Sequence, residues 1–189
     1  MPMIRECVVT TVGPTGQHHI APLGLIEDGE FWVIAPFRPS TTLANLEAAP
    51  FATASFIDDV RIFAGCVCGR SGWPMEPVPD WPAPRLAAAL THAELEVVRN
   101  EADPQRPRFF CRIRKIVPHK PFLGFNRAQS AVVEAAILAT RLGMLPREKI
   151  DTELAYLRIA IDKTAGAGER EAWELVTAKI EAYLQTQSE

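Results

Sequence analysis

The sequence has no surplus of basic residues. Its 189 residues include 20 Lys and Arg against 23 Asp and Glu, which gives a formal net charge of −3. This balance does not favour nucleic acid or an anionic membrane as a partner, so any anion-binding site has to be local. Hydrophobic residues make up 48% and charged residues 23% of the chain, which is typical of a globular protein with a well-filled core.

Long apolar runs are also lacking. No stretch approaches the length of a membrane span. The opening MPMIRECVVTT has neither the charged start nor the long apolar core of a signal peptide. We therefore expect no membrane association and a cytoplasmic location.

Cysteine is scarce, and the four cysteines do not form a metal motif. Cys66-Val67-Cys68 is a C-x-C rather than the C-x-x-C of zinc and redox sites, and no pair of histidines follows at zinc-finger spacing. The neighbours of Cys7, Cys66, Cys68 and Cys111 are typical of strands. We expect buried thiols on strands and no metal site.

Several catalytic and nucleotide-binding motifs are absent as well. There is no G-x-x-x-x-G-K-[ST], and Gly166-Ala167-Gly168 lies between predicted helices rather than after a first strand. These absences disfavour ATP-type and dinucleotide-type phosphate sites and leave a mononucleotide held against a β surface. No Ser-His-Asp or Cys-His arrangement, and no pair of carboxylates in contrasting environments, can be assembled from the sequence.

The first third of the chain is rich in β-branched residues separated by short polar turns. This pattern predicts an antiparallel meander, then a short helix that Pro50 ends, then another strand. Residues 58–69 are expected to add a further short piece. The predicted strands are 6–13, 18–26, 31–37 and 51–57, and the predicted helix is 41–49.

The middle of the chain is dominated by proline. Five prolines in residues 70–85 predict an ordered loop without regular structure, held by Trp73 and Trp81. A short helix is predicted over 83–92, and period-two alternation predicts two more strands over 93–103 and 108–117. About six strands with antiparallel connections indicate a closed or half-closed barrel.

From about residue 126 the apolar period becomes helical. Helices are predicted over 126–142, 146–166 and 169–185. The fold class is therefore α+β, an antiparallel barrel followed by a C-terminal three-helix unit. The expected domains are residues 1–122 and 123–189.

One stretch places unusual polar chemistry before a helix. In Arg38-Pro39-Ser40-Thr41-Thr42, one cation and three hydroxyls precede the predicted helix, where backbone N–H groups also favour an anion. A plain helix cap is the alternative, but it needs only one hydroxyl. The residue types alone leave both interpretations open.

Three segments of the chain carry a resemblance to a known family. VVTTVGPTGQHHIAPLGL, FWVIAPFRPSTTLANLEAAPFATASFIDD and FNRAQSAVVEAAILATRLGMLPREKI resemble uncharacterised proteins with an FMN-binding split-barrel, flavin reductase-like fold. That family occurs in archaea and in bacteria that use tetrahydromethanopterin-linked one-carbon metabolism. The resemblance implies a homodimer with FMN at the subunit interface and kinship with flavin reductases and pyridoxamine-phosphate-oxidase-like proteins.

The resemblance also implies roles for particular residues. It assigns the FMN phosphate to the block that opens the helix, and the flavin ring to the first two strands; Asn45 faces either the ribityl chain or solvent. For Arg127 three partners remain open: the FMN phosphate, a substrate carboxylate, or Glu134. The roles of His18 and His19 stay open between a general acid and solvent-facing side chains. The implied cofactor-binding residues are Thr10, Thr11, Ala21, Pro22, Leu23, Gly24, Phe37, Arg38, Ser40, Thr41, Thr42, Asn45 and Arg127.

The function that the resemblance implies is an FMN-dependent oxidoreductase. Hydride or electron transfer at the flavin would act on an unidentified small molecule, in a step linked to pterins. Two alternatives remain: a module that binds or delivers FMN without turnover, and an assembly protein whose barrel has lost the flavin.

Overall fold

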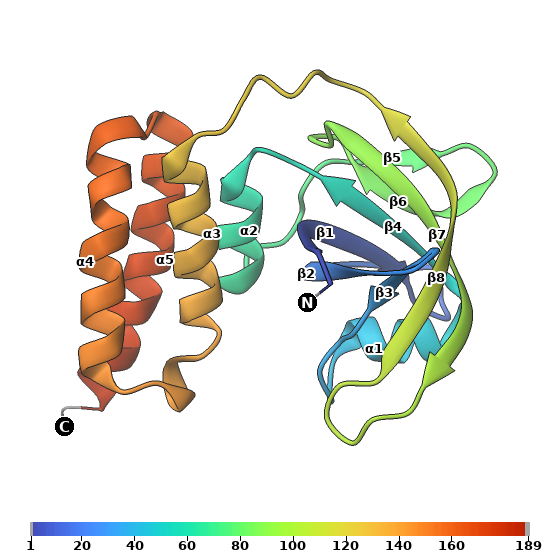
Figure 1. Ribbon diagram of the computed structural model, residues 1–189, viewed down its shortest axis with the longest axis horizontal. Coiled ribbons are helices and arrows are strands. Elements are labelled where there is room, and N and C mark those ends of the chain that lie inside the picture. Colours follow the sequence, from blue (N-terminus) through green and yellow to red (C-terminus); the bar gives the residue numbers. More distant parts are fainter. Residues whose placement is uncertain (1, 188–189) are drawn as a thin grey trace. The chain divides into compact units, whose positions relative to one another are not determined.

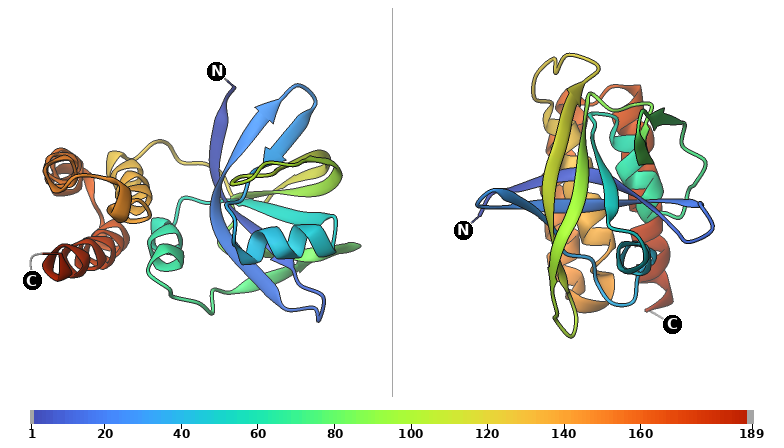
Figure 2. Two further views of the ribbon diagram at one scale, coloured as in Figure 1. Left: turned by 90° about the horizontal axis from the view of Figure 1, so that it is seen from below. Right: turned by 90° about the vertical axis from the view of Figure 1, so that its right-hand side faces the viewer.

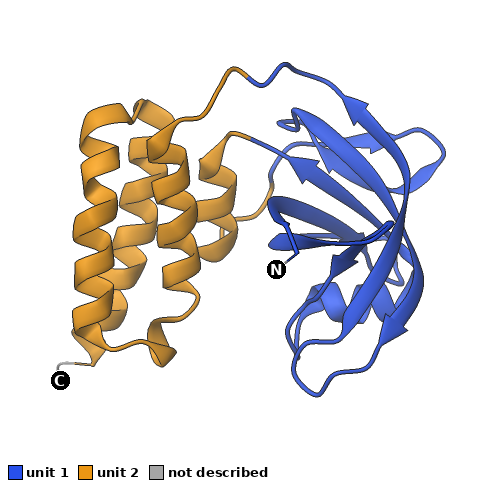
Figure 3. Ribbon diagram, viewed as in Figure 1, with its two compact units in different colours: residues 1–57, 73–122 blue, residues 58–72, 123–189 orange. Residues whose placement is uncertain are grey.

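The computed structural model describes residues 2–187, which form two compact units (Figure 3). Unit 1 consists of the chain up to Ile57 together with Trp73–Phe122. Unit 2 consists of Asp58–Gly72 and the chain from Leu123 onward. The segment Asp58–Gly72 therefore interrupts unit 1 in sequence and belongs to the helical unit.

Unit 1 is a closed antiparallel barrel with the strand order β1-β2-β3-β8-β7-β4 (Figure 1). This confirms the predicted α+β fold with an antiparallel barrel. The strands are β1 (Ile4–Val12), β2 (His18–Asp28), β3 (Phe31–Ile34), β4 (Phe51–Phe56), β7 (Thr91–Glu101) and β8 (Arg108–Pro118).

Strand alternation builds the core of the barrel. Cys7 and Val9 on β1 pack with Ala52 and Ala54 on β4 because every second side chain points to the same face. Cys111 on β8 joins the same core, so the prediction of buried strand thiols is confirmed for Cys7 and Cys111. Burial raises the pKa of the Cys111 thiol to about 12, which keeps it protonated and unreactive at neutral pH.

Helix α1 (Thr41–Ala48) connects β3 to β4 and lies against β1 and β2 (Figure 2). Its side chains Leu43 and Leu46 are buried in the barrel core. Pro50 follows the helix and precedes β4, as predicted. The packing of α1 fixes the position of its N-terminus relative to the first two strands.

The proline-rich segment differs from the prediction. Residues 75–86 form a two-stranded sheet of β5 (Met75–Val78) and β6 (Trp81–Leu86), so the irregular loop over 70–85 and the helix over 83–92 were wrong. Prolines are tolerated in a two-stranded sheet because many of its N–H groups need no strand partner. The sheet is tied to the barrel: the Thr53 hydroxyl donates to the Ala83 carbonyl at 2.6 Å, and the Trp81 indole N–H donates to the Ala52 carbonyl at 3.2 Å.

Unit 2 contains the three predicted C-terminal helices and one further helix. These are α3 (Arg127–Ala139), α4 (Arg147–Thr164) and α5 (Ala167–Thr186), with a 3-10 turn, η1 (Leu142–Met144), between α3 and α4. Buried Trp173, Val176 and Ile180 on α5 share one core with α3. No helix within residues 2–187 has both the length and the apolarity to cross a membrane.

The further helix is α2 (Val60–Val67), where the sequence suggested an additional piece next to the strands. Asp59 caps it: its carboxylate accepts from the Arg61 N–H at 3.2 Å. The apolar side of α2 packs on α3 and α5, so a run of residues with strand-like character folds as a helix. Cys66 and Cys68 consequently lie on and after a helix, which corrects the prediction that they are on strands.

Candidate functional site

The site predicted for an anion is the N-terminus of α1. Ser40 has an extended backbone, and its Oγ accepts a hydrogen bond from the Leu43 N–H at 3.3 Å, so Ser40 is the N-cap. Thr41 is exposed and Thr42 is buried at the first two helical positions. The first turn of α1 contains no acidic residue, so the partial positive charge of its N–H groups is not offset by a carboxylate there.

Arg38 forms an ion pair with a residue in the last turn of α1. Its guanidinium lies 3.4 Å from a carboxylate oxygen of Glu47 on α1, and both side chains are about half exposed. An exposed ion pair of this kind contributes little, about 0–1 kcal/mol. A bound anion could therefore compete with Glu47 for the Arg38 guanidinium.

A second cation next to this segment was missed from the sequence. Arg106, in the turn between β7 and β8, donates from Nε to the Ala35 carbonyl at 2.7 Å. Its guanidinium also lies 4.8 Å from the centre of the Phe37 ring. The Arg38 N–H donates to the Gln105 carbonyl at 2.9 Å, so the two loops are joined by backbone as well.

The turn that carries Arg106 is itself ordered. The Asp103 carboxylate accepts hydrogen bonds from the N–H groups of Gln105 and Arg106, and these bonds lower its pKa; the charge of Arg38 adds to the effect. The sequence marks these residues only as the connection between the strands predicted over 93–103 and 108–117. An Arg between two prolines, in a turn that closes a barrel strand pair, is the signal that could have indicated it.

The predicted ring-binding residues of β1 do not share one face. Thr10 and Thr11 are both fully buried, but neighbouring strand residues point to opposite sides of the sheet. Thr11 Oγ1 accepts a hydrogen bond of 3.0 Å from Asn45 Nδ2. Asn45 is 3% exposed, so the alternative that it faces solvent is wrong.

Thr10 faces the other way and has an unsatisfied hydroxyl. Its Oγ1 is buried without a hydrogen-bond partner, and the residue lies opposite Ile20 on β2 and Thr53 on β4. A buried hydroxyl without a partner costs free energy, about 1–3 kcal/mol, unless something supplies the missing bond. The Thr10 hydroxyl is therefore a buried polar group whose missing hydrogen bond a ligand atom or a water molecule could supply.

The predicted residues of β2 form the strand opposite β1. Ala21, Pro22, Leu23 and Gly24 are all half-buried and pair with residues 9 to 6 of β1. A Cβ at Gly24 would lie 2.6 Å from Ile4 Cγ2, so a larger residue there would displace the Ile4 side chain independently of any ligand. Next to them, burial lowers the pKa of His19, which favours its neutral form, whereas His18 is exposed.

A pair of histidines, one buried and one exposed, lies elsewhere in the barrel. His92 on β7 is 3% exposed, and its Nδ1 is 2.7 Å from His119 Nε2, just after β8. Burial first, and then the charges of His119, Arg85 and Lys115, lower the pKa of His92 to about 4. Within residues 2–187 no group of three or more His, Cys, Asp or Glu side chains is placed to hold a metal ion.

The remaining predicted residue, Arg127, belongs to the other unit. It is the first residue of α3, after the N-cap Asn126, whose side chain accepts from the Ala128 N–H at 2.8 Å. Arg127 and Glu134 line the same groove in unit 2, but no ion pair joins them. Of the three partners considered for Arg127, Glu134 is thereby removed.

The comparisons with known proteins place the barrel in the flavin reductase-like split-barrel class. An FMN-bound protein from Methanosarcina mazei matches 95% of this chain and 96% of its own with a TM-score of 0.82 and 21% identity. The 2-nitrobenzoate 2-nitroreductase of Pseudomonas fluorescens matches 63% of this chain and 66% of its own with a TM-score of 0.53 and 19% identity. Flavin reductase PheA2 matches 60% of this chain and 78% of its own with a TM-score of 0.52 and 13% identity.

The chain belongs to the family of proteins of unknown function DUF447. Its N-terminal domain model matches residues 5–120 and its C-terminal model matches residues 126–178. The Methanosarcina mazei protein is described as a member of the same family. No curated protein matches the chain.

Proposed function

We propose that unit 1 binds FMN, with the phosphate at the N-terminus of α1 and the ring along β1 and β2. The observation that carries the proposal is the start of α1: its first-turn N–H groups lack an acidic neighbour, and Ser40, Thr41 and Thr42 surround them. Arg38 would leave its ion pair with Glu47 to add one cation there, and we add Arg106 as a second, fixed next to Phe37. The FMN-bound family member from Methanosarcina mazei supports the choice of cofactor.

The residues proposed for the ring fit a flat, partly polar molecule. The half-buried backbone of Ala21–Gly24 adjoins β1 across the strand pair, whereas the Thr10 hydroxyl, although without a partner, is fully buried on the face of β1 opposite to Thr11. The Thr11–Asn45 hydrogen bond couples the ring strand to the phosphate helix. In this proposal Asn45 holds α1 in position and makes no direct contact with the ribityl chain.

We further propose that the protein is an oxidoreductase that works as a homodimer in the cytoplasm. FMN, when bound, would supply hydride or electron transfer at N5. The chain's own residues would hold the phosphate, orient the ring and limit the access of water to the flavin. A role in pterin-linked one-carbon metabolism is proposed only on the resemblance of the sequence; flavin reductases among the structures of similar fold support the reaction class.

A second candidate is a module that binds or delivers FMN without turnover. It is favoured by the side chains proposed for the ring: Thr10, Thr11, Ala21, Pro22, Leu23 and Gly24 include no titratable group. Such a surface can bind a flavin, but it offers no acid or base of its own to a substrate.

An absorption spectrum of the purified protein separates the candidates. Flavin bands at about 370 and 450 nm, or their appearance on protein dialysed against FMN, are expected under both. Loss of the 450 nm band on anaerobic addition of NADH or NADPH supports the oxidoreductase, whereas a yellow protein that neither donor reduces supports the carrier. A colourless protein that does not take up added FMN would refute both.

A further inference from the structure

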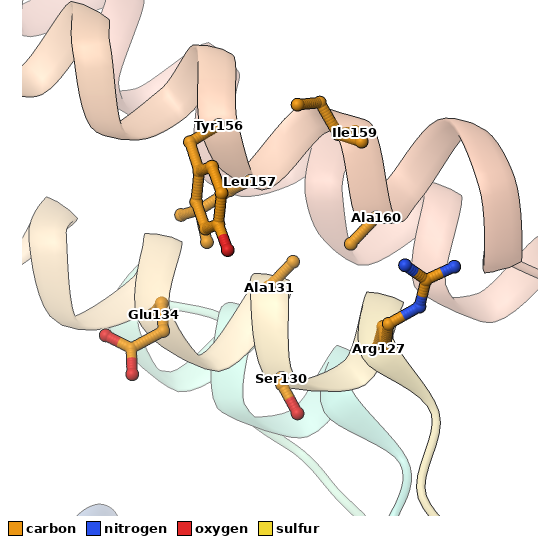
Figure 4. Close-up of a pocket in the computed structure, with 8 residues that line it drawn as sticks. All are labelled: Arg127, Ser130, Ala131, Glu134, Tyr156, Leu157, Ile159 and Ala160. Atoms are coloured by element: carbon orange, nitrogen blue, oxygen red, sulfur yellow. The ribbon is translucent and has the colours of Figure 1, made fainter.

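A groove between α3 and α4 in unit 2 has the composition of a small-molecule site (Figure 4). Its volume is about 300 Å³, at the lower end of the range for ligand pockets. Arg127 and Glu134 lie at its two ends on α3, and Tyr156 overhangs it from α4. All residues that line this groove belong to unit 2.

The hollow follows from small side chains at facing positions. Ala131 on α3 and Ala160 on α4 point toward each other across the groove, and Leu157 completes an apolar floor. Arg127, Ala131 and Glu134 share one face of α3 because they are spaced by three and four residues. Larger residues at Ala131 and Ala160 would fill the space that the two alanines leave open.

The polar groups around this floor are available to a ligand. The side chains of Arg127, Glu134 and Tyr156 form no hydrogen bond or ion pair with other described residues. The Arg127 guanidinium presents donors in a fork that fits a carboxylate in a bidentate manner. The Tyr156 side chain, which is 74% exposed, offers a ring face on which an aromatic body can stack.

We propose that this groove binds a small aromatic carboxylate, with the carboxylate at Arg127 and the aromatic body over Ala131, Leu157 and Ala160 beneath Tyr156. The negative charge of the ligand decides its orientation in the groove, because Arg127 lies at the cationic end and Glu134 at the anionic end. Seven residues of helix separate these ends, about 10 Å along the axis, which is the length of a two-ring compound. The same length is too short for a docked helix of a second protein to bury its usual surface.

The test uses 2-naphthoate as the probe and 2-naphthamide as its neutral counterpart, titrated by NMR into the full-length protein. The expected result is saturable 2-naphthoate binding with shifts on α3 and α4, at least tenfold tighter than the amide. Arg127→Ala should weaken 2-naphthoate about tenfold, as expected for one lost charge-assisted contact. Ala160→Leu should abolish binding by filling the groove.

Arg158→Ala is the matched control, because Arg158 is an exposed cation on α4 that pairs with Asp162 and does not line the groove. It should bind 2-naphthoate as the wild type does. Equal affinity in Arg127→Ala and wild type, no saturable binding, or shifts confined to unit 1 would each overturn the proposal. So would a change of oligomeric state in Arg127→Ala, since the groove would then be an interface between copies.

Discussion

Asn45 on α1 donates a buried hydrogen bond of 3.0 Å to the Thr11 hydroxyl on β1. The bond joins the helix whose N-terminus is the proposed phosphate site to the strand proposed to bind the ring. Both side chains are buried from water, so each depends on the other for a hydrogen-bond partner.

Removing either partner should destabilise unit 1. Asn45→Ala or Thr11→Val should each lower the free energy of unfolding by about 1–3 kcal/mol, because the remaining group is left buried and unsatisfied. The double variant Thr11→Val/Asn45→Ala should lose less than the sum of the single losses. Urea denaturation measures all three, and strictly additive losses would show that the two side chains are not coupled.

Arg106 should contribute to FMN binding although it lies far from α1 in sequence. Arg106→Ala removes a cation and the hydrogen bond to the Ala35 carbonyl, and we expect FMN affinity to fall about tenfold. Arg108→Ala is the matched control, since Arg108 starts β8 but pairs with Asp28. Flavin fluorescence quenching measures both, and equal affinities in the two variants would remove Arg106 from the site.

His92 should make stability depend on pH. In the folded protein its pKa is about 4, below the ordinary value of 6.5, so the unfolded chain takes up a proton that the folded chain does not. The stability due to neutral His92 is complete above pH 6.5 and is lost as the pH falls from 6.5 toward 4. Melting temperatures measured across this interval should fall more steeply for the wild type than for His92→Gln.

The control for this experiment is His18→Gln, which removes an exposed histidine from the same unit. His18→Gln should retain the wild-type slope of melting temperature against pH. A slope in His92→Gln as steep as that of the wild type would show that other groups cause the pH dependence.

The sequence predicted the elements whose structure follows from the spacing of apolar residues along the chain. Alternation of apolar residues identified the barrel strands, and the helical period identified α3, α4 and α5. The same reasoning failed for α2, where Val, Ile and Phe favour a strand locally, but packing against α3 and α5 selects a helix. It failed again at β5 and β6, where contacts of Thr53 and Trp81 between distant segments hold prolines in a sheet.

The candidate site was predictable only where its residues adjoin one another in sequence. The cluster at residues 38–42 stood out because its polar residues adjoin one another in sequence. Arg106 did not, because only the closure of the barrel brings residue 106 to residues 35–37. The opposite orientations of Thr10 and Thr11 follow from strand alternation, but the hydrogen-bond partner of Thr11 comes from the packing of α1 on β1.

The central claim is that the start of α1 holds a flavin phosphate. The most direct test compares the binding of FMN with that of riboflavin, which lacks the phosphate, in the wild type and in Arg38→Ala/Ser40→Ala. Asp59→Ala controls for the loss of a helix cap, because Asp59 caps α2 in unit 2. We predict that the double variant weakens FMN by about 2–5 kcal/mol and leaves riboflavin unchanged. Unchanged FMN affinity, or an equal loss for both ligands, would contradict the account.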